Sequence, residues 1–223
     1  MKLTRQLNLS DLNTAYEPLT GVERVERIFN DFDPERILVT SSFGATSAIL
    51  LNMVSRVAPD HPVYFINTGY LFEETLKYKE TIKDQLDLNV IDTSGPHNHH
   101  RFTQQNQSWK YNSDLCCFIN KVSPTEKLRN GKDVWLSGLM RYQNANREKL
   151  RIFEPRHDVL KFHPIIDMTE EEVQAYATIY ELPFNPLIYQ GYGSIGCTHC
   201  TAKGEGREGR WLNTGKTECG LHA

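Results

Sequence analysis

The chain has 223 residues, with 24 % charged and 39 % hydrophobic side chains, a composition typical of a globular protein long enough for one α/β domain with a sizeable core. Its net charge of −3 argues against nucleic acid and acidic membranes as partners, because both select a basic face. No apolar run approaches the roughly 20 residues that cross a bilayer, and the start lacks a signal-peptide pattern, so we expect a cytoplasmic protein.

The first part of the chain alternates helices with short apolar strands. Helices are predicted over 22–29, 48–54 and about 72–86. Buried strands are predicted over 37–40, 63–66, 89–91 and 134–137. Strands that are apolar throughout, rather than at every second position, are typical of a parallel sheet covered on both faces. We therefore predict an α/β fold with a parallel twisted sheet and helices on both of its faces.

Three polar segments follow predicted strands, at 41–47, 67–71 and 138–147. In such sheets ligands bind beyond the carboxyl ends of the strands, so we expect these segments to gather along one edge. The polar stretch 96–113, with three of the histidines, is predicted as solvated surface helix and loop. These histidines are His97, His99 and His100.

The second half of the chain is harder to assign. Thr169 should cap a helix, with Glu172 at the capping-box position. From Gly191 onward Gly and Cys are frequent, with scattered Lys and Arg. Such a segment is either disordered or built around a ligand.

Four of the five cysteines form two short motifs, the adjacent pair Cys116-Cys117 and the CxxC pair Cys197-Thr-His-Cys200. Thiolates are soft ligands for zinc or iron–sulfur clusters. On a helix, adjacent side chains lie roughly 100° apart, so both can reach one bulky cluster. Three alternatives stay open: a thioredoxin-like redox CxxC, a structural four-cysteine zinc site, and two inert buried cysteines at 116 and 117.

The fifth cysteine, Cys219, lies four residues from the end of the printed sequence, near Lys216 and His222. A nucleophilic thiolate needs nearby positive charge, and the adjacent Glu218 works against it. Cys219 is therefore either a nucleophile that is activated when the segment docks, or an ordinary surface cysteine.

At this point the residues resemble a known family. The chain is similar to the adenylyl-sulfate and phosphoadenylyl-sulfate reductases, and its two cysteine motifs resemble the cluster-containing branch. The resemblance covers about Ile37 to the C-terminus. It rests on Ser-Ser-Phe-Gly-Ala at 41–45, Asn-Thr-Gly-Tyr-Leu-Phe at 67–72, Cys116-Cys117 with Lys121, Ser-Gly-Leu-Met-Arg-Tyr-Gln at 137–143, Cys197-Thr-His-Cys200, Arg-Glu-Gly-Arg-Trp at 207–211 and Lys-Thr-Glu-Cys-Gly-Leu-His at 216–222.

The resemblance implies an adenine nucleotide α-hydrolase-like fold and roles for particular residues. A modified phosphate loop would comprise Ser41, Ser42, Gly44 and Ser47. The adenosine would meet Asn67, Thr68 and Gly69. The phosphosulfate would meet Lys121, Arg141, Arg207 and Arg210, with His222 and Trp211 helping to position the docked end of the chain. Without the resemblance, the first group is only a Ser/Gly-rich helix start, the second a strand-end turn and the third a set of solvated charges.

Three positions depart from the family pattern. Asn120 and Met140 stand where arginine is usual, and Thr46 stands where an acidic residue is frequent. These departures affect the predicted anion site and leave all five cysteines in place.

The implied activity is reduction of adenylyl sulfate to sulfite and AMP, with Cys219 as nucleophile and thioredoxin or glutaredoxin as electron donor. A [4Fe-4S] cluster would be held by Cys116, Cys117, Cys197 and Cys200. The expected organisation is one domain over 1–223, with an N-terminal helical segment to about residue 35 and a mobile catalytic tail from about 205. Reduction of the 3′-phosphorylated substrate, an ATP-using adenylating enzyme, a zinc-binding module and assembly into a homo-oligomer all remain open.

Overall fold

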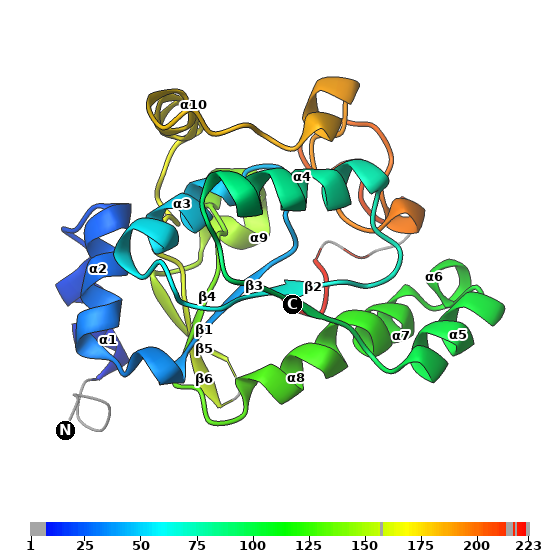
Figure 1. Ribbon diagram of the computed structural model, residues 1–223, viewed down its shortest axis with the longest axis horizontal. Helices are drawn as coiled ribbons and strands as arrows, with labels where there is room; N and C mark the ends of the chain where they lie inside the picture. The colour runs from blue at the N-terminus through cyan, green and yellow to red at the C-terminus, as the bar shows by residue number, and fades with distance from the viewer. Residues whose placement is uncertain (1–7, 157, 213–215, 217, 222–223) are drawn as a thin grey trace.

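The computed structural model describes residues 8–156, 158–212, 216 and 218–221. A six-stranded sheet runs through the centre of the molecule in the order β3-β2-β1-β4-β6-β5 (Figure 1). All neighbouring strands are parallel except the edge pair β5–β6. The strands are β1 (Ile37–Ser41), β2 (Val63–Ile66), β3 (Val90–Thr93), β4 (Val134–Leu136), β5 (Phe153–Arg156) and β6 (Val159–Phe162).

The four strands predicted from the sequence are confirmed, and the sheet contains two more. The β5–β6 hairpin was not predicted, because Pro155 and two charged residues interrupt the apolar pattern of β5. Proline is tolerated there because β5 is an edge strand, with one side free of ladder hydrogen bonds. The parallel sheet therefore carries one antiparallel edge.

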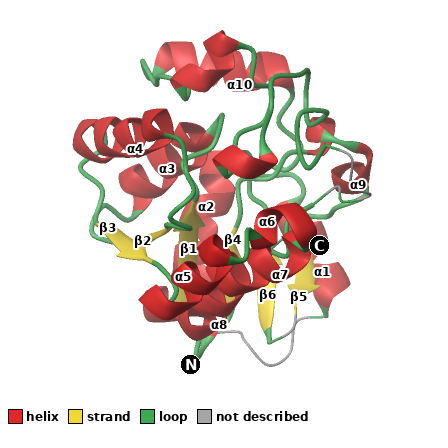
Figure 2. Ribbon diagram, turned by 90° about the vertical axis from the view of Figure 1, so that its right-hand side faces the viewer, coloured by secondary structure: helices red, strands yellow, loops and turns green. Residues whose placement is uncertain are grey.

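Helices cover both faces of the sheet, as predicted (Figures 1 and 2). Helices α3 and α4 lie on one face, and α8 lies on the other. Thr169 caps α10, and its capping box with Glu172 is confirmed. The helices are α1 (Leu9–Tyr16), α2 (Gly21–Asp31), α3 (Ser47–Val57), α4 (Glu73–Gln85), α5 (His97–Gln105), α6 (Ser108–Tyr111), α7 (Ser113–Cys117), α8 (Ser123–Arg129), α9 (Ala145–Glu148) and α10 (Glu170–Ile179), with single turns η1 (Pro34–Arg36), η3 (Arg141–Gln143), η4 (Pro186–Gln190) and η5 (Thr198–Cys200) and a π-helical turn η2 (Phe118–Val122).

The side chains of alternate residues in the central strands pack into two separate hydrophobic clusters, one on each face of the sheet. Ile37 and Val39 of β1 belong to the main core, which also contains residues of α2 and α3. Leu38, between them, points to the opposite face and joins a smaller cluster with Trp135 and Val159. Leu128 of α8 and Leu221 near the end of the chain pack against that smaller cluster, so the C-terminal segment lies on the α8 face of the sheet.

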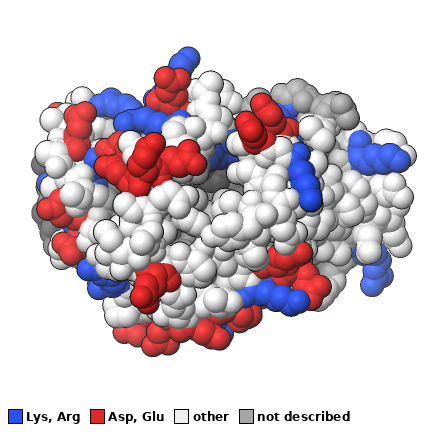
Figure 3. Space-filling model, turned by 90° about the horizontal axis from the view of Figure 1, so that it is seen from above, with Lys and Arg blue, Asp and Glu red and all other residues white. Residues whose placement is uncertain are grey.

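The surface has no single dominant charge on the face seen from above. Lysine and arginine side chains there are interspersed with aspartate and glutamate (Figure 3). Among the described residues, no helix combines the length and the apolar character that crossing a membrane requires.

Candidate active site

The strand order changes direction between β1 and β4, and the loops that follow these strands lie at the same edge of the sheet. The first of them, between β1 and α3, is a tight turn. The Ser41 hydroxyl accepts a hydrogen bond from the Phe43 amide at 3.1 Å, and the Ser47 hydroxyl donates to the Gly44 carbonyl at 3.1 Å. Phe43 adopts a positive φ of 48° and is buried, which fixes the path of the loop.

A buried asparagine from a distant segment holds this turn in place. Asn185 is 0 % exposed and donates from its amide nitrogen to the Phe43 carbonyl at 3.0 Å and to the Thr75 hydroxyl at 3.1 Å. At the start of α3, Thr46 makes no side-chain capping hydrogen bond. The first amides of this helix are therefore left without a side-chain cap, which is the arrangement that favours an anion at a helix N-terminus.

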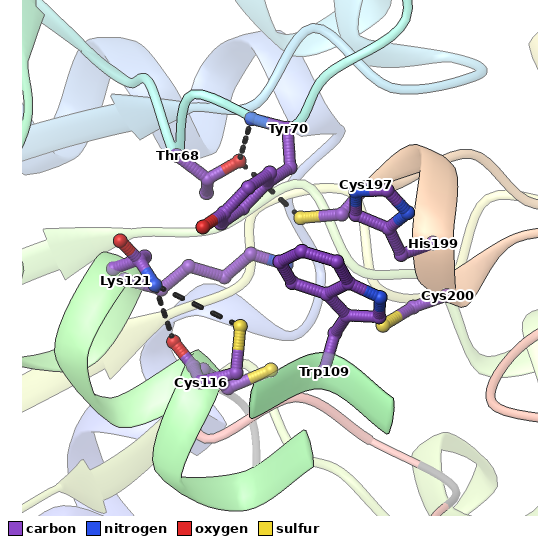
Figure 4. A pocket seen from close by; sticks show the side chains of 10 residues that line it. Thr68, Tyr70, Trp109, Cys116, Lys121, Cys197, His199 and Cys200 are labelled. Carbon is purple, nitrogen blue, oxygen red and sulfur yellow. Dashed lines mark hydrogen bonds between the residues drawn. The ribbon is translucent and has the colours of Figure 1, made fainter. Parts of the chain in front are cut away.

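The four paired cysteines line one pocket (Figure 4). Cys116 and Cys117 end α7, while Cys197 and Cys200 flank and close η5. The pocket comprises about 270 Å³, part of it open to solvent. Its other lining residues are Thr68, Tyr70, Trp109, Asn120, Lys121 and His199. All four cysteines are free thiols, and the first three are buried.

Polar neighbours hold the sulfur-bearing segments in position. The Thr68 hydroxyl lies 3.3 Å from Cys197 Sγ, and the Thr198 amide donates to the Tyr70 carbonyl at 2.8 Å. The Asn120 amide donates to the Cys116 carbonyl at 3.0 Å and approaches Cys116 Sγ at 3.7 Å. Asn120 is 4 % exposed, so this departure from the family pattern has a defined local role.

The thiols are close enough to influence one another electrostatically. Burial raises the pKa of Cys116 to about 12, and the charges of Cys117, Cys197 and Cys200 add to the effect. Burial alone would lower the pKa of Lys121, but the charges of Cys197, Cys219 and Cys117 outweigh it and raise the pKa. Four thiolates in this pocket therefore require compensating positive charge, and Lys121 supplies part of it.

No group of three or more His, Cys, Asp or Glu side chains among the described residues is gathered closely enough to hold a metal ion. The cysteines instead surround the pocket from two sides, the α7 side and the η5 side.

The C-terminal segment lies against the body of the protein through several contacts. Lys216 forms an ion pair with Asp114 of α7 at 2.6 Å. Arg156 donates to the Gly220 carbonyl at 3.2 Å, and Lys161 donates to the Leu221 carbonyl. Cys219 lies between these contacts and is partly exposed.

Positive charge surrounds Cys219 in this docked position. Four basic side chains lie close enough to Cys219 to interact with it electrostatically: Lys121, Arg156, Lys161 and Arg207. Burial lowers the pKa values of Arg156, Lys161 and Arg207, whereas the pKa of Lys121 is raised. Burial lowers the pKa of Lys161 to about 7, which shows how strongly its ammonium is desolvated beside the Trp135 ring, 4.4 Å away. Basic side chains from the β5–β6 hairpin and the CxxC loop region thus gather around the segment that carries Cys219.

The family model described as "Phosphoadenosine phosphosulfate reductase domain" matches residues 36–203. The chain belongs to this family. An adenosine 5'-phosphosulfate reductase of Halalkalibacterium halodurans is 34 % identical over 226 residues, which cover 97 % of this chain and 97 % of that protein. A phosphoadenosine 5'-phosphosulfate reductase of Aliivibrio fischeri is 34 % identical over 231 residues, covering 99 % of this chain and 90 % of that protein.

The chain shares its fold with a solved structure of a phosphoadenylyl-sulfate reductase. The crystal structure of phosphoadenylyl-sulfate (PAPS) reductase from Candida auris in a phosphate complex matches with a TM-score of 0.75 at 24 % identity, over 89 % of this chain and all of that chain. The likeness establishes the common architecture, an α/β sheet with helices on both faces.

Within this reductase-family chain, most of the predicted site residues lie around the two regions just described. Ser41, Ser42, Gly44 and Ser47 form the β1–α3 turn, and Asn67 and Gly69 form the turn after β2, where the Asn67 side chain accepts from the Gly69 amide at 2.9 Å. Thr68 is turned inward to the cysteine pocket.

The predicted cations divide into two sets. Arg207 reaches the C-terminal segment, and Arg210 donates to the Cys200 and Ile195 carbonyls of the CxxC loop. Arg141 instead donates to the Leu150 carbonyl at 3.1 Å. His222 lies outside the described residues.

Sequence reasoning missed several residues that shape the site. Arg156 and Lys161 come from the unpredicted β5–β6 hairpin, so no sequence signal linked them to Cys219. Asn185 lies in an irregular segment, and only the Asn-Pro dipeptide marked a turn there. Arg147 follows the 137–143 motif, which placed it at the correct sheet edge without indicating its partner.

Proposed function

We propose that the protein reduces adenylyl sulfate to sulfite and AMP, with Cys219 as the nucleophile and a dithiol protein such as thioredoxin or glutaredoxin as electron donor. The observation that carries this proposal is the docked position of Cys219, whose neighbours Glu218, Gly220 and Leu221 accept hydrogen bonds from Arg207, Arg156 and Lys161 respectively. Membership of the family and the names of relatives support the reaction class.

The first step transfers the sulfonate group to the protein. The Cys219 thiolate attacks the sulfur of adenylyl sulfate, a Cys219 S–S bond forms, and the bond from sulfur to the bridging oxygen breaks, with its electron pair leaving on the AMP phosphate. The cations around Cys219 stabilise the charge that develops on the phosphosulfate. The uncapped amides at the start of α3 are suited to an anionic group of the nucleotide.

The second step transfers electrons from the donor. One donor thiolate attacks Cys219 Sγ, and the S–S bond to the sulfonate breaks, with its electron pair leaving as sulfite. The second donor thiol then displaces Cys219, which leaves as thiolate while the donor becomes a disulfide. Cys219 must be exposed for this step, so we propose that a tail from about residue 205 to 223 of this single domain moves between the two partners.

The chemistry of the donor set supports a thiolate-bound group in the cysteine pocket. The four cysteines line it from two sides, and thiolates are soft ligands for iron–sulfur clusters. We propose that Cys116, Cys117, Cys197 and Cys200 hold a [4Fe-4S] cluster, which would supply a fixed negative charge beside Lys121 and need not change redox state. Lys121 would then couple that charge to the phosphosulfate. We also propose a cytoplasmic location, because a reducing compartment keeps such thiols free.

The 3′-phosphorylated nucleotide is a second candidate substrate, because relatives named for either nucleotide match at 34 % identity. The chemistry at Cys219 would be the same. Comparing kcat/KM for the two nucleotides decides between them.

The test uses protein purified without oxygen. Incubation with adenylyl sulfate and no donor should add one sulfonate to the wild-type protein, detectable by intact mass, and the Cys219→Ser variant should add none while keeping its iron. Iron and sulfide analysis of a Cys197→Ser variant should show loss of the cluster. Sulfonation of the Cys219→Ser variant equal to wild type would refute the nucleophile, and wild-type protein free of iron would refute the cluster.

A further inference from the structure

The residue before the nucleophile is a buried carboxylate with four hydrogen bonds. The Glu218 side chain is 7 % exposed. Its Oε1 accepts from Arg147 Nε at 2.7 Å and from Asn144 Nδ2 at 2.9 Å, and its Oε2 accepts from Arg147 Nη2 and from Arg207 Nη2, both at 3.0 Å. We call this group, Glu218 with Asn144, Arg147 and Arg207, the tail anchor.

Two of the three partners, Asn144 and Arg147, lie outside the proposed moving tail, whereas Arg207 lies near its start. Asn144 and Arg147 lie at the start and in the body of α9, at the edge of the sheet beyond β4, and Arg207 lies in the loop after η5. Arg147 is itself 7 % exposed, so its charge depends on the carboxylate for compensation. Breaking a buried pair by removing one partner leaves an uncompensated buried charge.

The anchor acts directly on Cys219, which is the next residue. While two guanidinium groups hold the Glu218 carboxylate, the adjacent backbone that carries the Cys219 thiol cannot move away from its docked position. Burial would raise the pKa of Glu218, but the hydrogen bond and charge of Arg147, with the charge of Arg207, lower it, so the carboxylate is ionised when docked. Its negative charge, adjacent to the thiol in sequence, is thereby balanced by the two arginines.

We propose that Glu218 is a positioning residue: the tail anchor holds Cys219 at the substrate for sulfonation and must open before the donor thiol can attack. This inference rests on the proposed function. It predicts that the tail anchor favours sulfonation of Cys219 and hinders the later attack of the donor thiol. Docking favours the first step because the cations surround Cys219. Release favours the second because the three hydrogen bonds from Asn144 and Arg147, which lie outside the tail, must break before Cys219 leaves its partly buried position.

Glu218→Gln removes the charge with little change of shape. The amide nitrogen of glutamine would face the N–H groups of Arg147 or Arg207, so at least one of the two carboxylate sides loses its hydrogen bonds. Glu218→Asp keeps the charge but is shorter by one methylene, so it should retain part of the anchoring. Glu205→Gln is the matched control, because Glu205 is an exposed carboxylate in the same loop region.

The experiment measures the half-reactions separately. Sulfonation by adenylyl sulfate without donor should be slowed roughly 30-fold or more in Glu218→Gln, the effect of breaking a buried charge pair. Release of sulfite from the pre-sulfonated protein by dithiothreitol should be unchanged or faster. Glu218→Asp should lie between Glu218→Gln and wild type in the first assay, and Glu205→Gln should match wild type in both.

Hydrogen–deuterium exchange of the C-terminal peptide measures how firmly the tail is docked, without any catalytic turnover. Exchange should be faster in Glu218→Gln than in wild type or Glu205→Gln, with iron content equal in all three. Equal slowing of both half-reactions, or wild-type exchange together with wild-type rates, would overturn the proposal. If wild-type protein takes up no sulfonate, the proposed function fails, while the exchange measurement still decides whether Glu218 anchors the tail.

Discussion

The indole of Trp109 stacks on the imidazole of His199, with ring centroids 4.0 Å apart and ring planes only 8° from parallel. Trp109 lies on α6, the helix before α7, and His199 lies between the two cysteines of the CxxC motif, so the stack joins the CxxC loop to the helix that precedes Cys116 and Cys117. Tyr70 contacts both rings, at 5.1 Å and 5.4 Å between centroids. These aromatic rings form part of the wall between the cysteine pocket and solvent.

Replacing Trp109 by Ala should expose the pocket and speed the loss of the proposed [4Fe-4S] cluster in air. The wall loses its largest ring and His199 loses its stacking partner, so water and oxygen reach the thiolates more easily. The visible absorbance of the cluster should decay several-fold faster than in wild type, while the iron content of protein kept under argon stays the same. A Phe102→Ala variant is the control, since Phe102 is an exposed ring on the neighbouring helix α5. Identical decay in the two variants would contradict a shielding role.

Replacing Lys121 by Ala should slow sulfonation of Cys219 by about 100-fold, the typical effect of removing one group that stabilises developing charge. Lys121 lines the cysteine pocket and is influenced by the Cys219 charge, so it lies between the two parts of the site. Iron content should be retained. Lys127→Ala, an exposed lysine of α8, should react at the wild-type rate. If Lys121→Ala instead lost its iron, the role of Lys121 would be structural.

His163 should make the protein less stable in mild acid. Burial, with the charge of Lys161 adding to it, lowers the pKa of His163 to about 3 from an ordinary value of 6.5. As the pH falls below about 6.5 the unfolded chain binds a proton that the folded protein does not, so stability falls. Between pH 7.5 and 5.5 the loss from His163 is about 1.4 kcal/mol.

The measurement is urea unfolding at the two pH values. His61 also has a pKa lowered to about 4 by burial, so the wild-type loss has two histidine contributions. A His163→Gln variant should show a pH dependence smaller by about 1.4 kcal/mol, whatever its stability at pH 7.5. A pH dependence unchanged from wild type would mean that His163 binds its proton as readily in the folded protein as in the unfolded chain.

Replacing Arg24 by Ala should destabilise the protein by about 3 kcal/mol. Arg24 is 2 % exposed and pairs with Asp167, and its guanidinium also donates to the Tyr16, Glu17 and Pro164 carbonyls. These contacts tie the N-terminal helices to the segment after β6, and without the arginine the buried carbonyls lose their donors. The free energy of urea unfolding checks this.

A matched variant at an exposed ion pair separates the effect of burial on stability from the effect of charge. Arg36 pairs with Asp133 at 2.5 Å, but its side chain is 50 % exposed. Arg36→Ala should therefore cost less than about 1 kcal/mol, as exposed ion pairs do. Equal losses in the Arg24 and Arg36 variants would show that burial of the Arg24 contacts does not govern stability.

The sequence by itself determined the elements whose residues are patterned locally. The runs at 37–40, 63–66 and 134–137 are buried on both sides, so their apolar character alone predicted strands of a parallel sheet, and their loops predicted the edge where a site forms. The cysteine motifs predicted a shared pocket because adjacent positions on a helix and a CxxC turn each direct two sulfurs to one side. The β5–β6 hairpin gave no such signal, since an edge strand can carry proline and charge.

Only the tertiary structure decided what surrounds Cys219. In the sequence, Glu218 adjacent to Cys219 opposes a thiolate, and no local pattern indicates what balances it. In the fold, Arg147, 71 positions earlier, neutralises that carboxylate, and Arg156 and Lys161 of the hairpin reach the same segment. Electrostatic contacts act through space and depend on burial, so their partners are fixed by how the sheet edge, the CxxC loop and the C-terminal segment pack together rather than by spacing along the chain.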